Sequence, residues 1–112
     1  MVLDECTEYP ATYARSKESM ELSMRWAERC KKAFTKRKGY GLFGIIQGGM
    51  FGDLRKESTK ILNEIEFDGY ALGGLSVGEN HEQMINVVKE TTQHIYIEKT
   101  RYIMGVGRPV DI

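Results

Sequence analysis

Residues 69–79 constrain the fold more than any other part of this chain. They read GYALGGLSVGE, a short apolar run that leads directly into a loop rich in glycine. Glycine at a strand end lets the backbone approach a ligand and leaves its N–H and C=O groups unobstructed. Similar patterns occur at residues 44–49 and 102–107. Because parallel α/β proteins build binding sites at the carboxyl ends of their strands, these three strand ends predict one shared site.

The elements around these loops alternate between strand and helix. Apolar runs predict strands at residues 2–3, 42–46, 70–72 and 101–104, and helical periodicity predicts helices at 16–36 and 53–65. Asn80 and Gln83 resemble a capping pair that opens a third helix. Residues 108–112 resemble the first turn of another helix, because proline is favoured there. The order β-α-β-α-β-α-β predicts a parallel sheet covered by helices.

Apolar positions predict which side of each helix faces the sheet. The expected inner face of the first helix is Leu22, Trp26, Ala27, Cys30, Ala33 and Phe34. The expected inner positions of the second helix are Leu54, Ile61 and Ile65, and those of the third are Met84, Val87, Val88 and Thr91.

Two α/β architectures fit this order of elements. One is an open doubly wound sheet, and the other is four consecutive parallel β/α units of a (β/α)8 TIM barrel. A whole barrel needs about 250 residues, so a chain of this length would form about half of one. Sequence physics alone leaves the two architectures about equally favoured. In either case residues 1–112 form a single unit.

Composition excludes several broad classes of protein. The 16 basic and 16 acidic residues cancel, so no overall charge favours nucleic acid. The basic run at residues 31–38 is best explained as a solvated helix end, with a phosphate contact as the minority reading. No apolar segment approaches the roughly 20 residues needed to span a bilayer. Cys6 and Cys30 are expected to be free thiols, and His81 and His94 to be surface residues that bind no metal.

Four motifs occur in order along the chain. They are DECT before YPA at residues 4–11, GIIQG at 44–48, FDGYALGGLSVGE at 67–79 and YIMGVG at 102–107. Together they resemble the bacterial tRNA-guanine transglycosylases, also called queuine tRNA-ribosyltransferases, over essentially all 112 residues. The resemblance favours the barrel and makes this chain the middle segment of a barrel that carries a zinc-binding insertion. Members exchange the wobble guanine of certain tRNA anticodons for a 7-substituted deazaguanine, through a covalent tRNA intermediate.

The resemblance also implies a set of residues that bind the base. Asp4 would accept two N–H bonds from the pairing edge of the base, as an ionised carboxylate can. Gln47 and the backbone N–H of Gly74 would donate to the base carbonyl. Leu75 would receive the exocyclic amine of the base on its backbone carbonyl, and Met104 would lay its thioether against the base face. Taken without the family, each has a plainer explanation as turn cap, loop residue or core filler.

Three further residues are expected to shape the pocket. The resemblance implies that Cys6, Gly73 and Val77 match bacterial members, which favour the small aminomethyl base over queuine. Cys6 could instead be a nucleophile, but the sequence places no partner base beside it.

The resemblance places other parts of the enzyme outside this chain. It implies a nucleophilic aspartate beyond Ile112, a Cys/Cys/Cys/His zinc site later still, and an acid–base aspartate before Met1. The isolated chain is therefore predicted to be inactive and to bind no cofactor, zinc belonging to the full-length protein. The expected partners of that protein are the tRNA anticodon loop, the deazaguanine base and a second copy in a homodimer. The protein is expected in the cytoplasm, without membrane association. The isolated chain is expected to self-associate.

Two alternatives come from other functional classes. The chain could be a small non-catalytic α/β module that binds a purine or nucleotide in its glycine loops. It could also be a structural half-barrel that is stable only when paired. Binding of guanine or the aminomethyl base to the isolated chain would separate the binding functions from the structural one.

Overall fold

A computed structural model describes residues 1–111 of the chain. Its helices are α1 (Tyr13–Ala33), α2 (Gly52–Ile65) and α3 (His81–Thr92), and its strands are β1 (Phe43–Ile46), β2 (Gly69–Leu72) and β3 (Thr100–Ile103). A single 3-10 turn, η1 (Pro109–Asp111), follows β3 at the position where a further helix start is expected. The rest of that expected turn, Ile112, lies outside the described residues.

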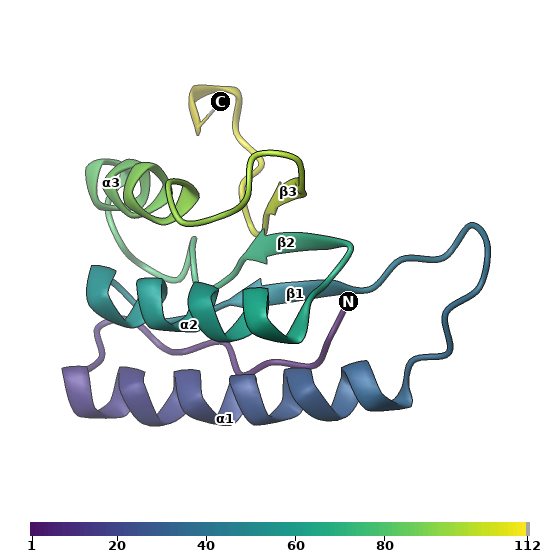
Figure 1. Cartoon of the computed structure of the whole chain (residues 1–112). Coiled ribbons are helices and arrows are strands. Elements are labelled where there is room, and N and C mark those ends of the chain that lie inside the picture. The colour runs from purple at the N-terminus through teal and green to yellow at the C-terminus, as the bar shows by residue number, and fades with distance from the viewer. Residues whose placement is uncertain (112) are drawn as a thin grey trace.

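The strands form one parallel sheet in the order β1-β2-β3. Gly44 lies opposite Tyr70, which in turn lies opposite Arg101. Strands that follow one another in the chain are therefore neighbours in space, and α1, α2 and α3 pack in the same order along the sheet (Figure 1). The predicted α/β class with a parallel sheet is confirmed.

The predicted strand at residues 2–3 is wrong. Within residues 1–111 this segment makes one bond of a ladder, from the Val2 N–H to the Phe43 carbonyl oxygen at 3.0 Å. The following N–H groups turn to α1 instead: Leu3 donates to Cys30 Sγ at 3.4 Å, and Glu5 donates to Ser23 Oγ at 2.9 Å. The described residues therefore contain three strands where four β/α units were expected, and the N-terminal segment runs beside β1 without extending the sheet.

Local capping sets where two of the helices begin. Thr12 caps α1 by accepting the Arg15 N–H on its hydroxyl at 3.1 Å, so α1 begins before the expected residue 16 and ends at Ala33. Asn80 and Gln83 form the predicted capping box: Asn80 Oδ1 accepts the Gln83 N–H at 2.8 Å, and Gln83 Oε1 accepts the Asn80 N–H at 3.0 Å. The start of α3 is therefore correctly predicted.

The buried face of α1 differs from the predicted one. It consists of Ser16, Ser19, Met20, Ser23, Met24 and Ala27, whereas Leu22, Trp26, Cys30 and Phe34 are only partly buried and Ala33 is exposed. Ser19 and Ser23 have hydrogen-bond partners in the segment before α1, whereas Ser16 Oγ is buried without a partner among the described residues. The hydroxyl of Ser19 lies 2.8 Å from that of Thr7, and Ser23 accepts the bond from Glu5. A prediction from apolar periodicity takes no account of such hydroxyl bonds, and it therefore misses the serines on the buried face of α1.

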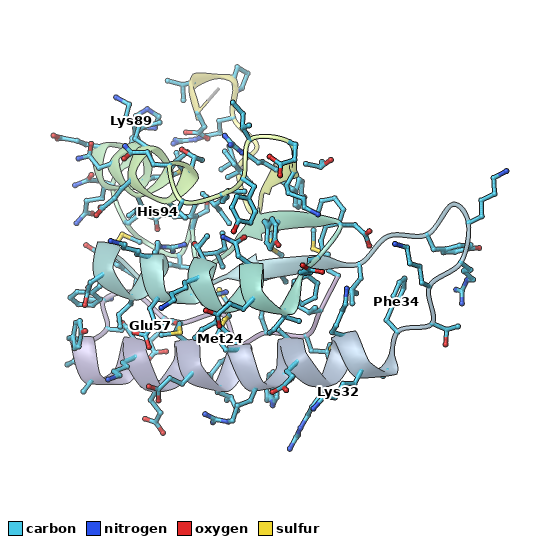
Figure 2. All side chains as sticks on the ribbon, in the orientation of Figure 1. Met24, Lys32, Phe34, Glu57, Lys89 and His94 are labelled. Carbon is cyan, nitrogen blue, oxygen red and sulfur yellow. The ribbon has the colours of Figure 1, made fainter. Side chains whose placement is uncertain are left out.

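The α2 prediction is closer and the α3 prediction is largely correct. Leu54 is fully buried as expected, but Ile61 and Ile65 are half-buried and Leu62 occupies the core in their place. In α3, Met84, Val87 and Thr91 are buried and Val88 is half-buried. Met24 of α1 lies between α1 and α2 (Figure 2), where its Sδ accepts a bond from Ser58 Oγ at 3.5 Å.

Candidate functional site

The predicted site residues follow the strand ends at one edge of the sheet. Gln47 comes directly after β1, Gly73 and Gly74 after β2, and Met104 after β3. The strand ends are held together by backbone bonds, because Gly73 N–H donates to Ile46 O at 3.0 Å and Met104 N–H donates to Leu72 O at 3.1 Å. The shared edge expected from the three glycine loops is therefore present.

Asp4 and Gln47 meet at this edge. Gln47 Nε2 donates to Asp4 Oδ2 at 2.7 Å, with Gln47 fully buried and Asp4 half-buried. The opposite amide atom, Gln47 Oε1, is buried and has no hydrogen-bond partner among the described residues. The polar side-chain groups at this point are the Asp4 carboxylate and the Gln47 amide. This pair could receive a ligand that offers both donors and an acceptor.

Gly73 and Gly74 lie against the Gln47 amide. A Cβ atom on Gly73 would lie 2.6 Å from Gln47 Nε2, and one on Gly74 would lie 2.6 Å from Gln47 Oε1. Gly74 also has a φ of +66°, which glycine adopts without steric cost. A side chain at either position would therefore require the Gln47 amide to move, in addition to obstructing a ligand that approaches the backbone.

Leu75 and Met104 lie near each other but contribute differently. The Leu75 side chain is buried in the core, which leaves its backbone as the part that can reach a ligand. Its carbonyl oxygen would lie 3.1 Å from a Cβ on Gly105, the glycine after Met104. Met104 is half-buried and packs against the core cluster.

Cys6 lies beside these groups and is exposed. Burial of the sulfur raises the pKa of the Cys6 thiol and the Asp4 carboxylate raises it further, whereas the Gly74 N–H acts in the opposite direction. The net shift is upward, so the thiol is protonated at neutral pH. A nucleophilic thiolate is therefore disfavoured at this position.

Val77 belongs to a loop that Glu79 organises. The carboxylate of Glu79 accepts the Ser76 N–H at 2.5 Å and the Val77 N–H at 2.9 Å. Burial of Glu79 works to raise its pKa, but these backbone bonds outweigh it and the pKa is lowered overall. The loop is therefore held by an ionised carboxylate at neutral pH.

A cavity of about 200 Å³ lies next to this edge. Of the predicted residues, Gly74 and Val77 line it, whereas Asp4, Gln47, Leu75 and Met104 do not. The remaining walls come from the segment before α1, the start of α2 and α3, and they include Thr7, Tyr9, Pro10, Met50, Phe51 and Gln83. The structure thus brings Asp4, Cys6, Gln47 and Gly74 together. Gly74 and Val77 also line the cavity that lies beside this group.

Comparison with known proteins identifies the family. The family model described as queuine tRNA-ribosyltransferase matches residues 1–112. The queuine tRNA-ribosyltransferases of Rickettsia africae and Rickettsia conorii are each 53% identical to the chain over 112 residues, and that of Rickettsia massiliae is 52% identical. The chain belongs to the queuine tRNA-ribosyltransferase family. It is covered completely in these matches and spans 31% of the length of each relative.

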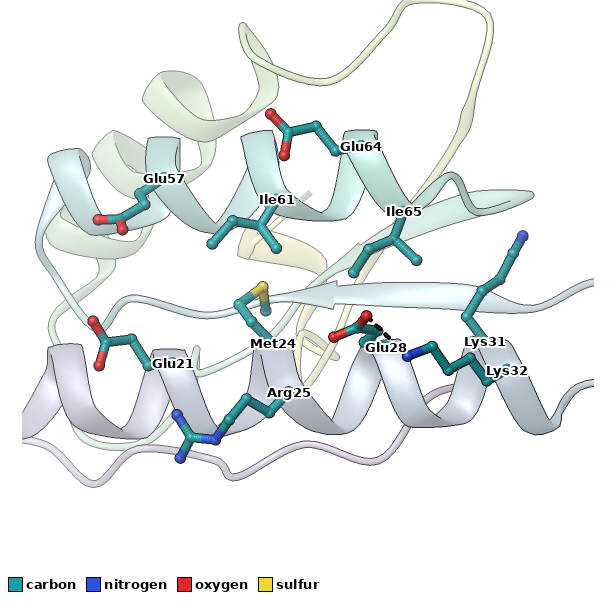
Figure 3. Close-up of a pocket in the computed structure, with 10 residues that line it drawn as sticks. All are labelled: Glu21, Met24, Arg25, Glu28, Lys31, Lys32, Glu57, Ile61, Glu64 and Ile65. Carbon is teal, nitrogen blue, oxygen red and sulfur yellow. Dashed lines mark ion pairs between the residues drawn. The ribbon is translucent and has the colours of Figure 1, made fainter.

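Another groove of the molecule lies away from this family's motifs. It has a volume of about 690 Å³ and runs between α1 and α2, with Met24, Ile61 and Ile65 on its floor and charged side chains along its rim (Figure 3). Its residues come from the middle and the C-terminal halves of the two helices, and none of the family motif residues lines it. We therefore do not assign it to base binding.

Neither a metal cluster nor a membrane span is found in residues 1–111. No group of three His, Cys, Asp or Glu side chains within this range could hold a metal ion, so these residues do not fit the zinc site implied by the family. No helix in the same range is long and apolar enough to cross a bilayer. His81 is exposed and lies 3.2 Å from Asp111, measured from Nδ1 to Oδ1.

Sequence reasoning missed two residues that organise the site of this family member. Glu79 was interpreted only as the end of the glycine loop, because the usual turn signal is a side chain that precedes the N–H groups it accepts from, whereas Glu79 follows Ser76 and Val77. Arg55 was not considered. Its position on α2 gives no sign that its side chain is buried, because the charged residues Asp53, Lys56 and Glu57 stand close to it in sequence.

Proposed function

We propose that this chain forms the base-recognition wall of a tRNA-guanine transglycosylase. The observation that carries the proposal is the Asp4–Gln47 contact beside Gly74, in a chain whose whole length matches the family. The parent reaction would exchange the wobble guanine of tRNA for a 7-substituted deazaguanine, a queuosine precursor, which makes the parent a pentosyltransferase. The same family membership supports placing β1, β2 and β3 with their helices in a (β/α)8 barrel. In the order β1-β2-β3 each strand lies beside the next strand of the chain, which agrees with a barrel.

Asp4 would recognise the two neighbouring N–H donors of the guanine pairing edge. An ionised carboxylate accepts both in a fork, and such charge-assisted bonds are stronger than neutral ones. Asp4 Oδ2 already accepts one N–H, from Gln47, in the chain without a ligand. Binding would therefore exchange the Gln47 donor for donors of the base and release Nε2 of Gln47.

The released Gln47 amide would donate to the carbonyl oxygen of the base. The backbone N–H of Gly74 would donate to the same oxygen, and the Leu75 carbonyl would accept the exocyclic amine of the incoming base. Met104 would cover the base face with its thioether. Cys6, Gly73 and Val77 would limit the space around the substituent at position 7. These residues bind and orient the base, and the bond exchange itself would need a nucleophile from elsewhere in the parent protein.

The wider context of the parent follows from the family and is part of the proposal. Its partners would be the tRNA anticodon loop and a second copy in a homodimer, in the cytoplasm. Zinc would be held by residues of the parent other than these 112. We propose that the isolated chain does not catalyse the exchange.

A chimaera tests the proposal. The 112 residues would replace the aligned segment of the Rickettsia africae relative, and incorporation of labelled guanine into tRNA would be measured. We expect the chimaera to exchange guanine and the 112-residue chain alone to exchange none. A folded chimaera that incorporates no guanine, beside an active Rickettsia protein, would contradict the proposal. Binding of guanine by the chain without exchange in the chimaera would favour a non-catalytic purine-binding module.

A further inference from the structure

Arg55 is a buried charge that no carboxylate contacts directly among the described residues, although the charge of Glu79 works to raise its pKa. Its side chain belongs to α2 and the residue is 1% exposed. Burial lowers its pKa to about 10, so the guanidinium is still charged at neutral pH. Keeping an unpaired charge inside a protein is costly, and the cost calls for strong hydrogen bonds to the charged group.

The bonds of Arg55 go to backbone carbonyls at the strand ends. Nε donates to Gly49 O at 2.7 Å, beyond the end of β1, and Nη2 donates to Gly73 O at 2.9 Å, beyond the end of β2. Nη1 makes a longer contact of 3.5 Å with Ile46 O. One side chain therefore ties together the two loops that carry Gln47 and Gly74.

The bond to Gly73 also sets the direction of the next N–H. In a planar trans peptide the C=O and the N–H point in opposite directions. Since the Gly73 carbonyl points to Arg55, the N–H of Gly74 in the same peptide points away from the guanidinium. On that side lies Cys6, whose thiol is influenced by the Gly74 N–H. The donor is therefore aimed at the group of residues that contains Asp4 and Cys6.

We propose that Arg55 is a positioning residue that aims the Gly74 N–H at the carbonyl oxygen of the bound base. This inference rests on the proposed function for the identity of the ligand. The guanidinium fixes the peptide between Gly73 and Gly74, and its charge polarises that peptide through the carbonyl, which strengthens the N–H as a donor. Because the same side chain also bonds to Gly49, it fixes the distance between the loop after β1 and the loop after β2.

The aim of the Gly74 N–H can be tested without any ligand. The 112-residue chain, labelled with ¹⁵N at its 12 glycines, would be compared with Arg55→Met, Arg55→Lys and the control Arg25→Met. Arg25 is an exposed arginine of α1. We expect the Gly74 amide proton to shift upfield and to exchange faster in Arg55→Met, to change less in Arg55→Lys, and to stay unchanged in the control. Arg55→Lys keeps the charge but has a single nitrogen, so it also serves if the Met variant does not fold.

The role in base recognition is tested with a ligand that differs at one atom. In the chimaera, exchange of guanine would be compared with that of 6-thioguanine, whose sulfur is a weaker acceptor than the carbonyl oxygen. We expect Arg55→Lys to reduce the preference for guanine about 3- to 10-fold, the loss for weakening one hydrogen bond. A purely structural role would lower kcat/KM for both bases by the same factor.

The two measurements separate this inference from the proposed function. A Gly74 resonance that is unchanged in a folded Arg55 variant would overturn the positioning role, whatever the chimaera does. An equal loss for guanine and 6-thioguanine would overturn its part in recognition. A chimaera without exchange in the presence of the expected Gly74 shift would instead count against the transglycosylase proposal and leave the geometry of Arg55 supported.

Discussion

Nε2 of Gln47 donates a hydrogen bond of 2.7 Å to Oδ2 of Asp4, although 43 positions separate the two residues in the sequence. The contact joins the N-terminal segment to the end of β1 in a chain where that segment adds no strand to the sheet. A carboxylate and a buried amide that bond to each other are also the two side chains proposed to bind a guanine-like base. The predictions below start from this pair and its neighbours.

Asp4→Asn in the chimaera should strongly reduce guanine exchange and leave the fold intact. The new amide would still offer an oxygen to Gln47, but would turn a donor toward the donors of the base. Such a mismatch costs about 1–3 kcal/mol, or roughly 5- to 150-fold in kcat/KM. Asp68→Asn is the control, because Asp68 Oδ2 accepts the Leu42 N–H near the opposite end of the strands. Normal exchange kinetics in Asp4→Asn would remove Asp4 from the site.

Gly74→Ala should destabilise the chain more than Gly39→Ala. Both glycines have positive φ, +66° and +85°, so both substitutions carry the backbone strain of roughly 1–2 kcal/mol. Only the Cβ at Gly74 would meet Gln47 Oε1, at 2.6 Å, whereas nothing lies within 4 Å of a Cβ at Gly39. Urea unfolding of both variants measures the difference. Equal losses of stability would show that Gln47 moves aside without cost.

Val77→Gly should improve the use of queuine relative to the aminomethyl base. Val77 is half-buried and lines the small cavity, so its removal enlarges the space beside Gly74. Val77→Ala is the graded control and should give a smaller change, since it keeps the backbone preference of a non-glycine residue. The ratio of kcat/KM values for the two bases is the measurement. A ratio that stays the same in both variants would place the loop away from the ligand.

Glu79→Gln should flatten the loss of stability in acid. Although burial opposes it, the bonds from Val77 and Ser76 lower the pKa of Glu79 below its ordinary value of 4.5. The unfolded chain therefore binds the proton more readily, so the stabilising contribution is present above about pH 4.5 and is lost as the pH falls toward the folded pKa. Thermal unfolding of the wild type, Glu79→Gln and the exposed control Glu18→Gln would be measured between about pH 3 and about pH 7. Parallel pH profiles for the wild type and both variants would contradict the role of Glu79.

The isolated chain should self-associate through the free edge of β3. Thr100, Arg101 and Tyr102 on this strand are exposed, Tyr102 by 49%, and Leu3 at the other edge is 69% exposed. Unpaired strands with apolar side chains favour pairing with another copy, most often as a two-fold dimer. Tyr102→Lys should weaken the association, because lysine on an edge strand opposes pairing. Sedimentation that finds only a folded 12.8 kDa species at high concentration would contradict the prediction.

Most of the fold was predictable because its signals are local. The capping box at Asn80 and Gln83 and the glycine loops after β1, β2 and β3 act within a few residues of chain. The N-terminal strand was predicted wrongly for the opposite reason. An apolar pair such as Val2–Leu3 forms a strand only if its N–H groups continue a ladder with a neighbouring strand. Here Val2 donates to Phe43 of β1, but the next N–H group, that of Leu3, donates to Cys30 on α1.

The sequence by itself determined the α/β class, the strand ends that carry the motifs and the family to which they belong. Only the tertiary structure decided that Asp4 meets Gln47, that Gln47 lies on two glycines and that Arg55 is buried against Gly49 and Gly73. The physical reason is the range of the interactions. Caps and turns depend on neighbours in the chain, whereas the burial of an amide or a guanidinium depends on which carbonyls and carboxylates distant segments bring to the same place.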